Sequence, residues 1–374
     1  MKRKLYIFNP ENDMALGCGK DSYNAPKWAL QWRHDLELLA GYLASDGSMV
    51  LARDAQAAQR WLDSRHLEVE AIDASMLHAL RDIEIVPWGW SMPLCKELAL
   101  AGMHRSLLPS PEEMATVRDL AHRRTSIAVH EAMRQEMNRD FSPIPVELGN
   151  SSDVLQWALA HPGCYIKTPW SGSGRGVYRA IDAGTEQFER WCAGAIARQG
   201  SVLCEEALDK VLDFALEYHC DAVTGCQFAG YSVFKSDEQS QYGCGIVDQP
   251  GALRHAIASL YPGIDAVNEG MRRVIERLIA PHYSGYLGVD MLLYRKGGAI
   301  DIDPCVEVNL RCTMGVVCRL WYDEHQQEGV FSVSPMRSFC SLSVLTTMIS
   351  SPSSGMIIFV PLPSINGATS FMWR

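Results

Sequence analysis

Several common signatures are missing from this sequence, and each absence narrows the classes of protein that it can encode. None of the twelve cysteines forms a C-x-x-C pair, so a zinc ribbon is not indicated. The least charged region, Phe331 to Arg374, is interrupted by Pro335, Pro352, Pro361 and Pro363, so a transmembrane helix is not indicated. Basic residues are in deficit, 34 against 44 acidic ones, and the net charge of −10 argues against a nucleic-acid or membrane partner.

A secretory signal peptide is not apparent either, because the basic start at Met1–Lys4 leads only into a short apolar run that ends at Pro10. We therefore expect a cytoplasmic protein whose cysteines are reduced thiols rather than a disulfide framework. At 374 residues the chain is too long for one ordinary core, so two or three domains are expected. No internal repeat relates them.

The first hundred residues alternate short apolar runs with helical patterns. This alternation predicts an open parallel sheet, whose ligands bind beyond the carboxyl ends of the strands. The loop after the first strand, residues 8–16, is then placed to touch a substrate; ordinary turn chemistry is the alternative. The predicted strands are 4–8, 48–52, 69–73 and 83–88, and the predicted helices are 25–44, with Asn24 as its N-cap, and 55–63.

The rest of the chain predicts helices alternating with antiparallel strands. Ser110-Pro111-Glu112-Glu113 is a strong helix start, and the helical pattern continues to Met137. The tail after Gly329 is Ser/Pro-rich, with a late strand candidate at 356–362. Further strands are predicted at 165–170, 176–180, 201–208, 212–222, 226–234, 241–247, 285–294 and 299–311, and helices at 151–161, 185–199, 265–280 and 313–326.

Among the motifs, the hairpin that ends in AIDIDPCVEVNLR (299–311) carries the most information. Apolar and polar residues alternate strictly along this stretch, which predicts a half-buried strand. Gly297-Gly298 is a two-residue turn signal that pairs it with 285–294. A solvated strand face is the plain alternative for its polar side.

The turn sets the register of this hairpin. It places Asp290 opposite Cys305 and makes Glu307 the diagonal neighbour of Asp290 on the same face. Two carboxylates and the Asn309 amide can then converge on a hard cation such as Mg²⁺, and Arg311 could reach a phosphate bidentately. We interpret Cys305 as a small strand-filling residue rather than a nucleophile.

Two further segments have the residue types of a phosphate and nucleotide site. YIKTPWSGSGRGV (165–177) places Lys167 at a strand end, followed by three glycines whose backbone can approach phosphates. It is neither a Walker A loop nor a dinucleotide fingerprint, because a strand follows the glycines. VLCEEALD (202–209) is an apolar strand ending in two acids, suited to an adenine and its ribose. Each segment taken alone is more often purely structural.

The order of these pieces resembles the ATP-grasp superfamily across roughly residues 110–328. That family has a lysine strand, a Gly-rich loop, an acidic hinge and a carboxylate-bearing hairpin ending in E-x-N-x-R, in this order. The resemblance implies an α/β N-terminal domain followed by two α+β subdomains that clamp ATP. The implied boundaries are 1–108, 109–200 for the small subdomain, 201–328 for the subdomain with the metal site, and 329–374 for a tail.

The resemblance also implies roles for individual residues. Lys167 would hold the ATP phosphates, and Arg311 would steady the transferred phosphoryl group; these two would be catalytic. Asp290, Glu307 and Asn309 match the family's metal ligands. The family's earlier ATP-binding lysine has no counterpart, and Arg123 or Arg124 would replace it, with Lys235 a weaker candidate. The remaining implied nucleotide contacts are Ser171, Gly172, Ser173, Gly174, Glu205, Glu206, Leu208, Asp213 and Arg124.

The implied activity is ligation of a carboxylate to an amine or thiol through an acyl phosphate, with ATP and Mg²⁺ (Mn²⁺ as a substitute). No Ser-His-Asp or Cys-His set competes with this interpretation. A phosphotransferase on the same fold, or a nucleotide-binding protein without activity, are the alternatives. The substrates would be small molecules or peptides, and relatives that pair suggest a homodimer. Asn9, Glu11, Asn12 and Asp13 are candidate acceptor-site residues, and Trp88 and Trp90 are interpreted as core.

Overall fold

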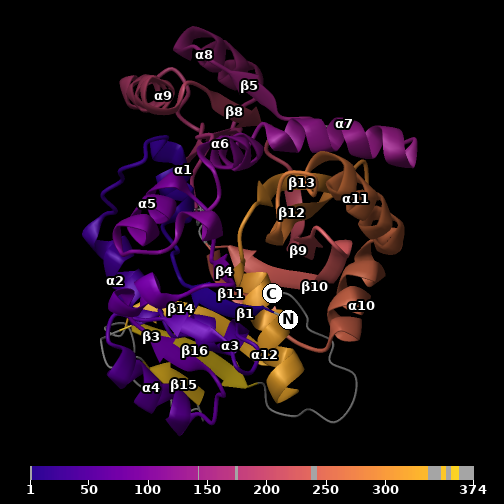
Figure 1. The fold of residues 1–374 in the computed structure, drawn as a ribbon. Coiled ribbons are helices and arrows are strands. Elements are labelled where there is room, and N and C mark those ends of the chain that lie inside the picture. The colour runs from indigo at the N-terminus through magenta and orange to yellow at the C-terminus, as the bar shows by residue number, and fades with distance from the viewer. Residues whose placement is uncertain are drawn as a thin grey trace.

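The chain forms three sheets with helices packed around them (Figure 1). No described helix is both long enough and apolar enough to cross a membrane. The eleven cysteines that the structure describes are free thiols. The computed structural model describes residues 2–141, 143–172, 176–236, 242–335, 347–350 and 355–361.

The first sheet is parallel, in the order β3-β2-β1-β4, as the alternating sequence pattern predicts. The predicted helix over 25–44 is wrong in detail: it is two helices separated by a turn, and it begins after Pro26 instead of Asn24. The elements are β1 Arg3–Ile7, α1 Asn12–Cys18, α2 Lys27–Asp35, α3 Leu39–Leu43, β2 Met49–Leu51, α4 Ala55–Ser64, β3 Glu70–Ile72, η1 Ala74–Ala79, β4 Ile83–Pro87, α5 Met92–Leu100 and η2 Arg105–Leu107.

The second sheet is antiparallel, in the order β5-β8-β6-β7, and lies at the top of Figure 1 with α8 and α9. The predicted helix start at Ser110 is confirmed, because its side chain and that of Glu113 form a capping box. The helical stretch that follows breaks between the two helices α6 and α7. The elements are α6 Pro111–Leu120, α7 Thr125–Met137, β5 Val146–Leu148, α8 Ser151–Ala160, β6 Tyr165–Lys167, β7 Val177–Arg179, α9 Glu186–Gln199 and β8 Val202–Glu205.

The third sheet has eight strands, in the order β13-β12-β9-β10-β11-β14-β16-β15. The late strand predicted at 356–362 is confirmed as β16, and helix α10 is an element that the sequence interpretation did not include. The elements are β9 Asp209–Asp221, β10 Gly225–Ser236, β11 Tyr242–Val247, α10 Pro250–Leu260, α11 Ile264–Leu278, β12 Gly285–Lys296, β13 Ala299–Asn309, α12 Met314–His325, β14 Gly329–Pro335, β15 Thr347–Ser350 and β16 Gly355–Pro361.

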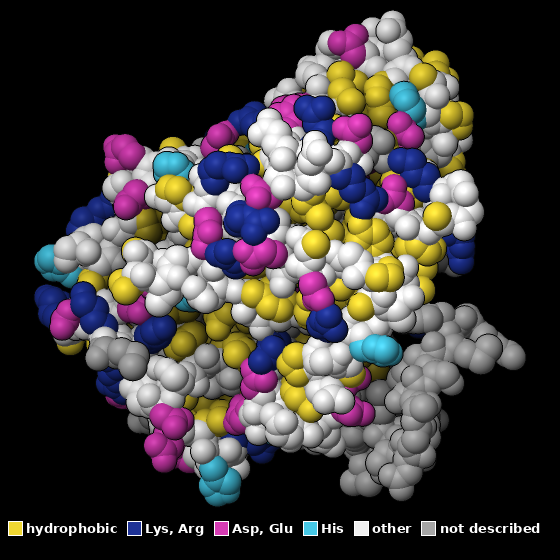
Figure 2. Space-filling model, turned by 90° about the vertical axis from the view of Figure 1, so that its right-hand side faces the viewer, with side chains coloured by type: hydrophobic (Ala, Val, Ile, Leu, Met, Phe, Trp, Pro, Cys, Tyr) yellow, Lys and Arg dark blue, Asp and Glu magenta, His cyan; other side chains and the backbone are white. Residues whose placement is uncertain are grey.

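Side chains along each strand of the large sheet point alternately to its two faces, so one face packs in a hydrophobic core and the other does not. On β9, Phe214, Leu216 and Tyr218 are fully buried in the core that also contains the apolar stripe of α11. Burying each such side chain contributes about 2 kcal/mol. The intervening residues of β9 therefore face the other way, toward the first two sheets. On the face of the molecule seen in Figure 2, acidic and basic side chains are interspersed.

Candidate active site

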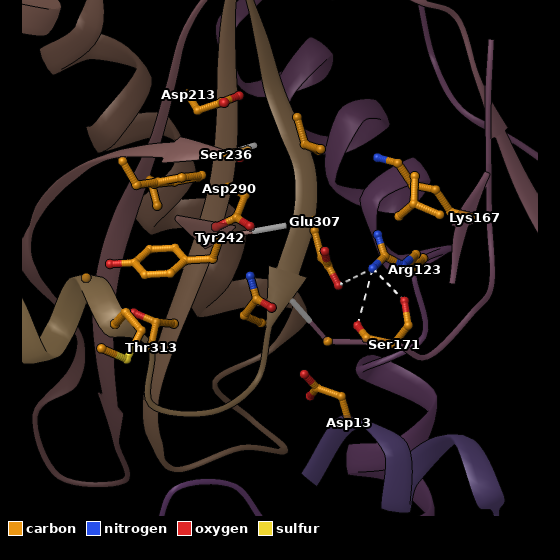
Figure 3. Close-up of a pocket in the computed structure, with 18 of the residues that line it drawn as sticks. Asp13, Arg123, Lys167, Ser171, Asp213, Ser236, Tyr242, Asp290, Glu307 and Thr313 are labelled. Carbon is orange, nitrogen blue, oxygen red and sulfur yellow. Dashed lines mark hydrogen bonds and ion pairs between the residues drawn. The ribbon is translucent and has the colours of Figure 1, made fainter. Parts of the chain in front are cut away.

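The face of the large sheet that points away from the α11 core arranges polar side chains in rows across β9, β12 and β13. Residues that are directly opposite each other on neighbouring strands share a face. Asp290 of β12 is opposite Glu307 of β13 on one side and Ala215 of β9 on the other. The next row toward the start of α12 contains Glu217 and Asn309, one on each side of Gly288. Figure 3 shows Asp213, Asp290 and Glu307 along this face.

The register of the hairpin differs from the prediction in a way that tightens the site. From the turn the ladder runs as predicted up to Asp303, but then β13 contains extra residues, and Asp290 is opposite Glu307 rather than Cys305. Pro304 has no N–H for the ladder, and the Cys305 N–H donates 3.0 Å to the Asp303 carboxylate instead of to a strand. The bulge turns Cys305 into the core, where it is fully buried. Two carboxylates thus face each other directly, where a diagonal pair was expected.

Glu217 is a site residue that the sequence interpretation missed. Its side chain lies where Gly288 and Gly315 leave room, because a Cβ on either glycine would approach its carboxylate to 2.7 or 2.0 Å. Burial, with a contribution from Asp290, raises the pKa of Glu217 to about 8. Glu217 lies two residues after Ala215 and four after Asp213 on the same strand. The period-2 alternation of a strand therefore predicts that all three share a face.

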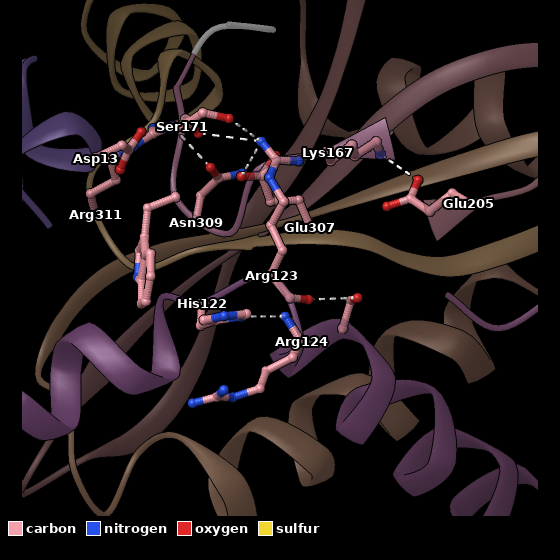
Figure 4. A network of polar contacts seen from close by, with 12 residues as sticks. Asp13, His122, Arg123, Arg124, Lys167, Ser171, Glu205, Glu307, Asn309 and Arg311 are labelled. Carbon is pink, nitrogen blue, oxygen red and sulfur yellow. Dashed lines mark hydrogen bonds and ion pairs between the residues drawn. The ribbon is translucent and has the colours of Figure 1, made fainter. Parts of the chain in front are cut away.

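The lysine and the hinge acids come from the small antiparallel sheet. Lys167 ends β6, is 8% exposed and forms an ion pair with Glu205 at the end of β8 (Figure 4). Glu206 and Leu208 follow on the same segment and also line the cavity. Lys167 thus faces Asp290 and Glu307 from across the cavity.

Arg123, and not Arg124, reaches this cavity. The Arg123 guanidinium donates 3.0 Å to the Ser171 hydroxyl and forms a 3.0 Å ion pair with Glu307 (Figures 3 and 4). Its backbone N–H donates to the Pro169 carbonyl, which turns the side chain inward. Arg124, the other predicted replacement for the lysine, does not line the cavity and pairs with Asp119, so the structure does not bring it together with the other predicted contacts.

The Gly-rich loop begins against the N-terminal domain. Ser171 and Gly172 line the cavity, and a Cβ on Gly172 would come within 2.6 Å of the Asp13 carboxylate, so the loop lies close to that side chain. The predicted contacts Ser173 and Gly174 lie outside the described residues.

Arg311 is fixed by three partners. Its Nε donates 2.9 Å to Asp13, one Nη donates 2.9 Å to the Asn309 side chain and the other donates 3.2 Å to the Cys312 carbonyl. Burial lowers the pKa of Arg311, but the charges of Asp13 and Glu307 raise it by more. The net shift is upward, so the guanidinium remains charged. Asp13, a candidate acceptor-site residue, therefore orients Arg311 next to Asn309.

One cavity of about 570 Å³ collects almost all of these side chains. Asn9 and Asn12, in contrast, do not line it; Asn9 donates 2.8 Å to the Gly89 carbonyl and supports the loop. Lys235 is exposed and also outside the lining, whereas its neighbours on β10 are part of it. The predicted residues that line the cavity are Glu11, Asp13, Arg123, Lys167, Ser171, Gly172, Glu205, Glu206, Leu208, Asp213, Asp290, Glu307, Asn309 and Arg311.

The electrostatics of the central row favour a cation. Burial and then the Glu307 charge raise the pKa of Asp290 to about 7, and burial also raises the pKa of Glu307. No cluster of three or more His, Cys, Asp or Glu ligands exists among the residues described. Two carboxylates and an amide oxygen remain, a donor set that suits Mg²⁺ when phosphate oxygens complete the shell.

His122 makes the segment before Arg123 sensitive to acid. The ring is 2% exposed, and its Nδ1 accepts 3.0 Å from the Arg124 N–H. Burial, and next the Arg124 charge, lower the pKa of His122 to about 4. The folded state therefore keeps the ring neutral, and its contribution to stability is present above pH 6.5 and is lost as the pH falls toward 4.

We expect wild type to lose about 2 kcal/mol of unfolding free energy through this group between pH 7 and pH 5. His122→Asn keeps an acceptor for the Arg124 N–H but has no titrating ring. Its free energy of unfolding, measured with urea, should therefore fall by about 2 kcal/mol less than that of wild type between pH 7 and pH 5. His104→Asn, at an exposed histidine, is the control and should follow wild type. Equal pH dependence of wild type and His122→Asn would contradict the assignment.

Comparison with known proteins identifies the fold. No protein-family model and no curated protein sequence matches the chain. Among solved structures, N5-carboxyaminoimidazole synthetase from Staphylococcus aureus, complexed with ADP, is similar with a TM-score of 0.54 and 12% identity over 97% of this chain and 95% of that one. Biotin carboxylase from Campylobacter jejuni, in a β-γ-ATP complex, gives 0.55 and 11% over 97% and 88%. This likeness confirms the ATP-grasp fold and the mixed α/β class that the motif order predicted.

Proposed function

We propose that this chain, whose fold is ATP-grasp, is an ATP- and Mg²⁺-dependent ligase that joins a carboxylate to an amine through an acyl phosphate. The observation that carries the proposal is the meeting of three groups in one cavity. The Asp290–Glu307 pair with Asn309 lies on one wall, Lys167 lies across from it, and Arg311 lies beside it. Phosphoryl transfer depends on positioning and charge neutralisation, which this set supplies.

Magnesium fits the row as a bound ion. Asp290, Glu307 and Asn309 would hold it. Burial and then the Glu307 charge raise the pKa of Asp290, and a bound cation would stabilise its charged form. Glu307 also pairs with Arg123, and the Asn309 side-chain oxygen also accepts a hydrogen bond from Arg311. The ion would neutralise phosphate charge as the γ-phosphoryl group leaves ADP.

The chain's own side chains serve the two steps as follows. In the first, a carboxylate oxygen of the substrate attacks the γ-phosphorus and the bond to the ADP oxygen breaks. Lys167 and Arg123 would hold the phosphate chain, and the Gly-rich loop at Ser171 would cover it. In the second, an amine nitrogen attacks the acyl carbon, loses a proton, and phosphate leaves. Arg311, fixed in plane by Asp13, would orient the acyl phosphate.

Nucleotide binding is the first test of this proposal. We expect calorimetric titration to show ATP binding that is stronger with Mg²⁺ than without it. In Glu307→Ala the gain from Mg²⁺ should fall by about 10- to 100-fold, because a metal ligand is lost. Wild type that binds no adenine nucleotide would refute the proposal.

The acyl phosphate separates ligase from kinase. Hydroxylamine converts an acyl phosphate to a hydroxamate but leaves a phosphorylated alcohol unchanged. We therefore expect a panel of carboxylates, incubated with ATP, Mg²⁺ and hydroxylamine, to yield hydroxamate together with ADP. ADP release without hydroxamate, accompanied by a stable phosphorylated product, would instead identify a phosphotransferase on the same fold.

A further inference from the structure

The cavity continues past Arg311 into a second end built from the N-terminal domain. This end is apolar and aromatic, and its walls come from the loop after β1, from α2 and from the strand end at Trp88. Phe8 and Trp88 pack edge to face at 5.1 Å, which fixes one wall. Trp32 on α2 is 36% exposed although it is a large ring. The aromatic and apolar lining residues here are Phe8, Met14, Trp28, Trp32, Leu36 and Trp88.

A single buried acid, Glu11, lies in this aromatic lining. Glu11 is 8% exposed, and its Oε1 accepts 3.0 Å from Arg33. Its Oε2 has no hydrogen-bond partner among the described residues. Burial raises the pKa of Glu11, whereas Arg33 lowers it, so a further cation nearby would stabilise the charged form.

The basic residues around this end are already neutralised by acids. The Arg33 guanidinium also donates 2.6 and 3.0 Å to Glu97, so one arginine is shared between two carboxylates. Arg311 is held by Asp13 in the same way. Arg33, Glu11 and Glu97 together therefore have a net negative charge, and they lie next to electron-rich rings. This combination attracts cations rather than anions.

We infer that the aromatic end binds the amine substrate, in its ammonium form, and that this substrate has an apolar or aromatic body. This inference rests on the proposed ligase function and names its acceptor class. Glu11 would pair with the ammonium and accept one of its protons, which frees the nitrogen lone pair for attack on the acyl carbon. The rings of Trp32 and Trp88 would contact both the charge and the body. Asp13 lies two residues from Glu11 and holds Arg311, so this end adjoins the place where the acyl phosphate would form.

The test uses three probes with the same phenyl body and different charge: phenethylamine, 2-phenylethanol and 3-phenylpropionate. Calorimetry on the full chain should show phenethylamine binding about tenfold more tightly than the neutral alcohol, and the carboxylate binding least. Glu11→Gln should abolish the preference for the amine. Glu37→Gln, a half-buried acid on the segment after α2 that does not line the cavity, should retain it.

Trp32→Ala provides a second variant in which the charge is untouched. It should weaken all three probes, the amine most because its cation–π contact is also lost, and keep the order of affinities because Glu11 remains. MgADP binding, measured on each variant, reports whether the nucleotide end is intact. If MgADP binds but the amine is no better than the alcohol, or no probe binds, the inference is overturned while the ligase proposal stands; loss of MgADP binding in wild type removes the ligase proposal itself.

Discussion

Asp290→Asn should make the protein more stable and nearly inactive. Asp290 is directly opposite Glu307, and burial together with that neighbouring charge raises its pKa to about 7. A raised carboxyl pKa means that its contribution to stability is complete below pH 3.8 and lost as the pH rises through 7. An amide of the same shape removes this cost, but it also removes a charged ligand from the proposed Mg²⁺ site.

We expect ATP turnover by Asp290→Asn to fall by about 10²- to 10³-fold. Without Mg²⁺ at pH 8 the variant should gain about 1–2 kcal/mol, a discounted value because solvent reaches the cavity. The gain should shrink toward zero near pH 4. Thermal unfolding in chelator at the two pH values, with turnover at pH 8, measures both effects.

Asp301→Asn is the control on the same hairpin. Asp301 pairs with Arg139 and does not line the cavity, so its substitution should leave turnover within about twofold and lower stability slightly. If Asp290→Asn kept near-normal turnover, Asp290 would have no role as a metal ligand. If the variant were instead less stable at pH 8, the charge repulsion inferred from the paired carboxylates would be wrong.

Local chemistry made much of the fold predictable. The Gly297-Gly298 turn has positive φ at both residues, 57° and 83°, which glycine adopts readily. The two adjacent glycines therefore predicted the position of the turn. The Ser110 helix start was equally local. The split between α2 and α3 was not predictable in this way, because the apolar periodicity continues across the turn and only tertiary packing ends the first helix.

The site was harder to predict where backbone register and side-chain direction decide. The bulge at Pro304 shifts Glu307 by two positions, and no period-2 pattern contains that shift. Arg123 and Arg124 are adjacent and chemically alike, and only the folded structure shows that Arg123 contacts Ser171 and Glu307 while Arg124 pairs with Asp119. The Asp13–Arg311 pair joins residues 298 positions apart, a contact that sequence patterns do not encode.

The geometry of Arg311 leads to the second large prediction. Asp13, Asn309 and the Cys312 carbonyl each bind a different nitrogen of its guanidinium, so its plane is fixed before any substrate arrives. A planar fork can orient two oxygens of a phosphoryl group at once, whereas a lysine ammonium is a point charge on a flexible stem. The two side chains therefore differ in orientation at equal charge.

Arg311→Lys should consequently lower kcat by about 10²-fold or more, while the Kd for MgADP changes by less than about threefold. Turnover and calorimetric titration on the same preparation separate the two effects. Arg139→Lys is the matched control, since Arg139 also pairs with an aspartate but lies outside the cavity, and it should keep its kcat. A normal kcat in Arg311→Lys would show that charge alone suffices there. A parallel loss of MgADP affinity would mean that Arg311 holds the nucleotide rather than the reacting group.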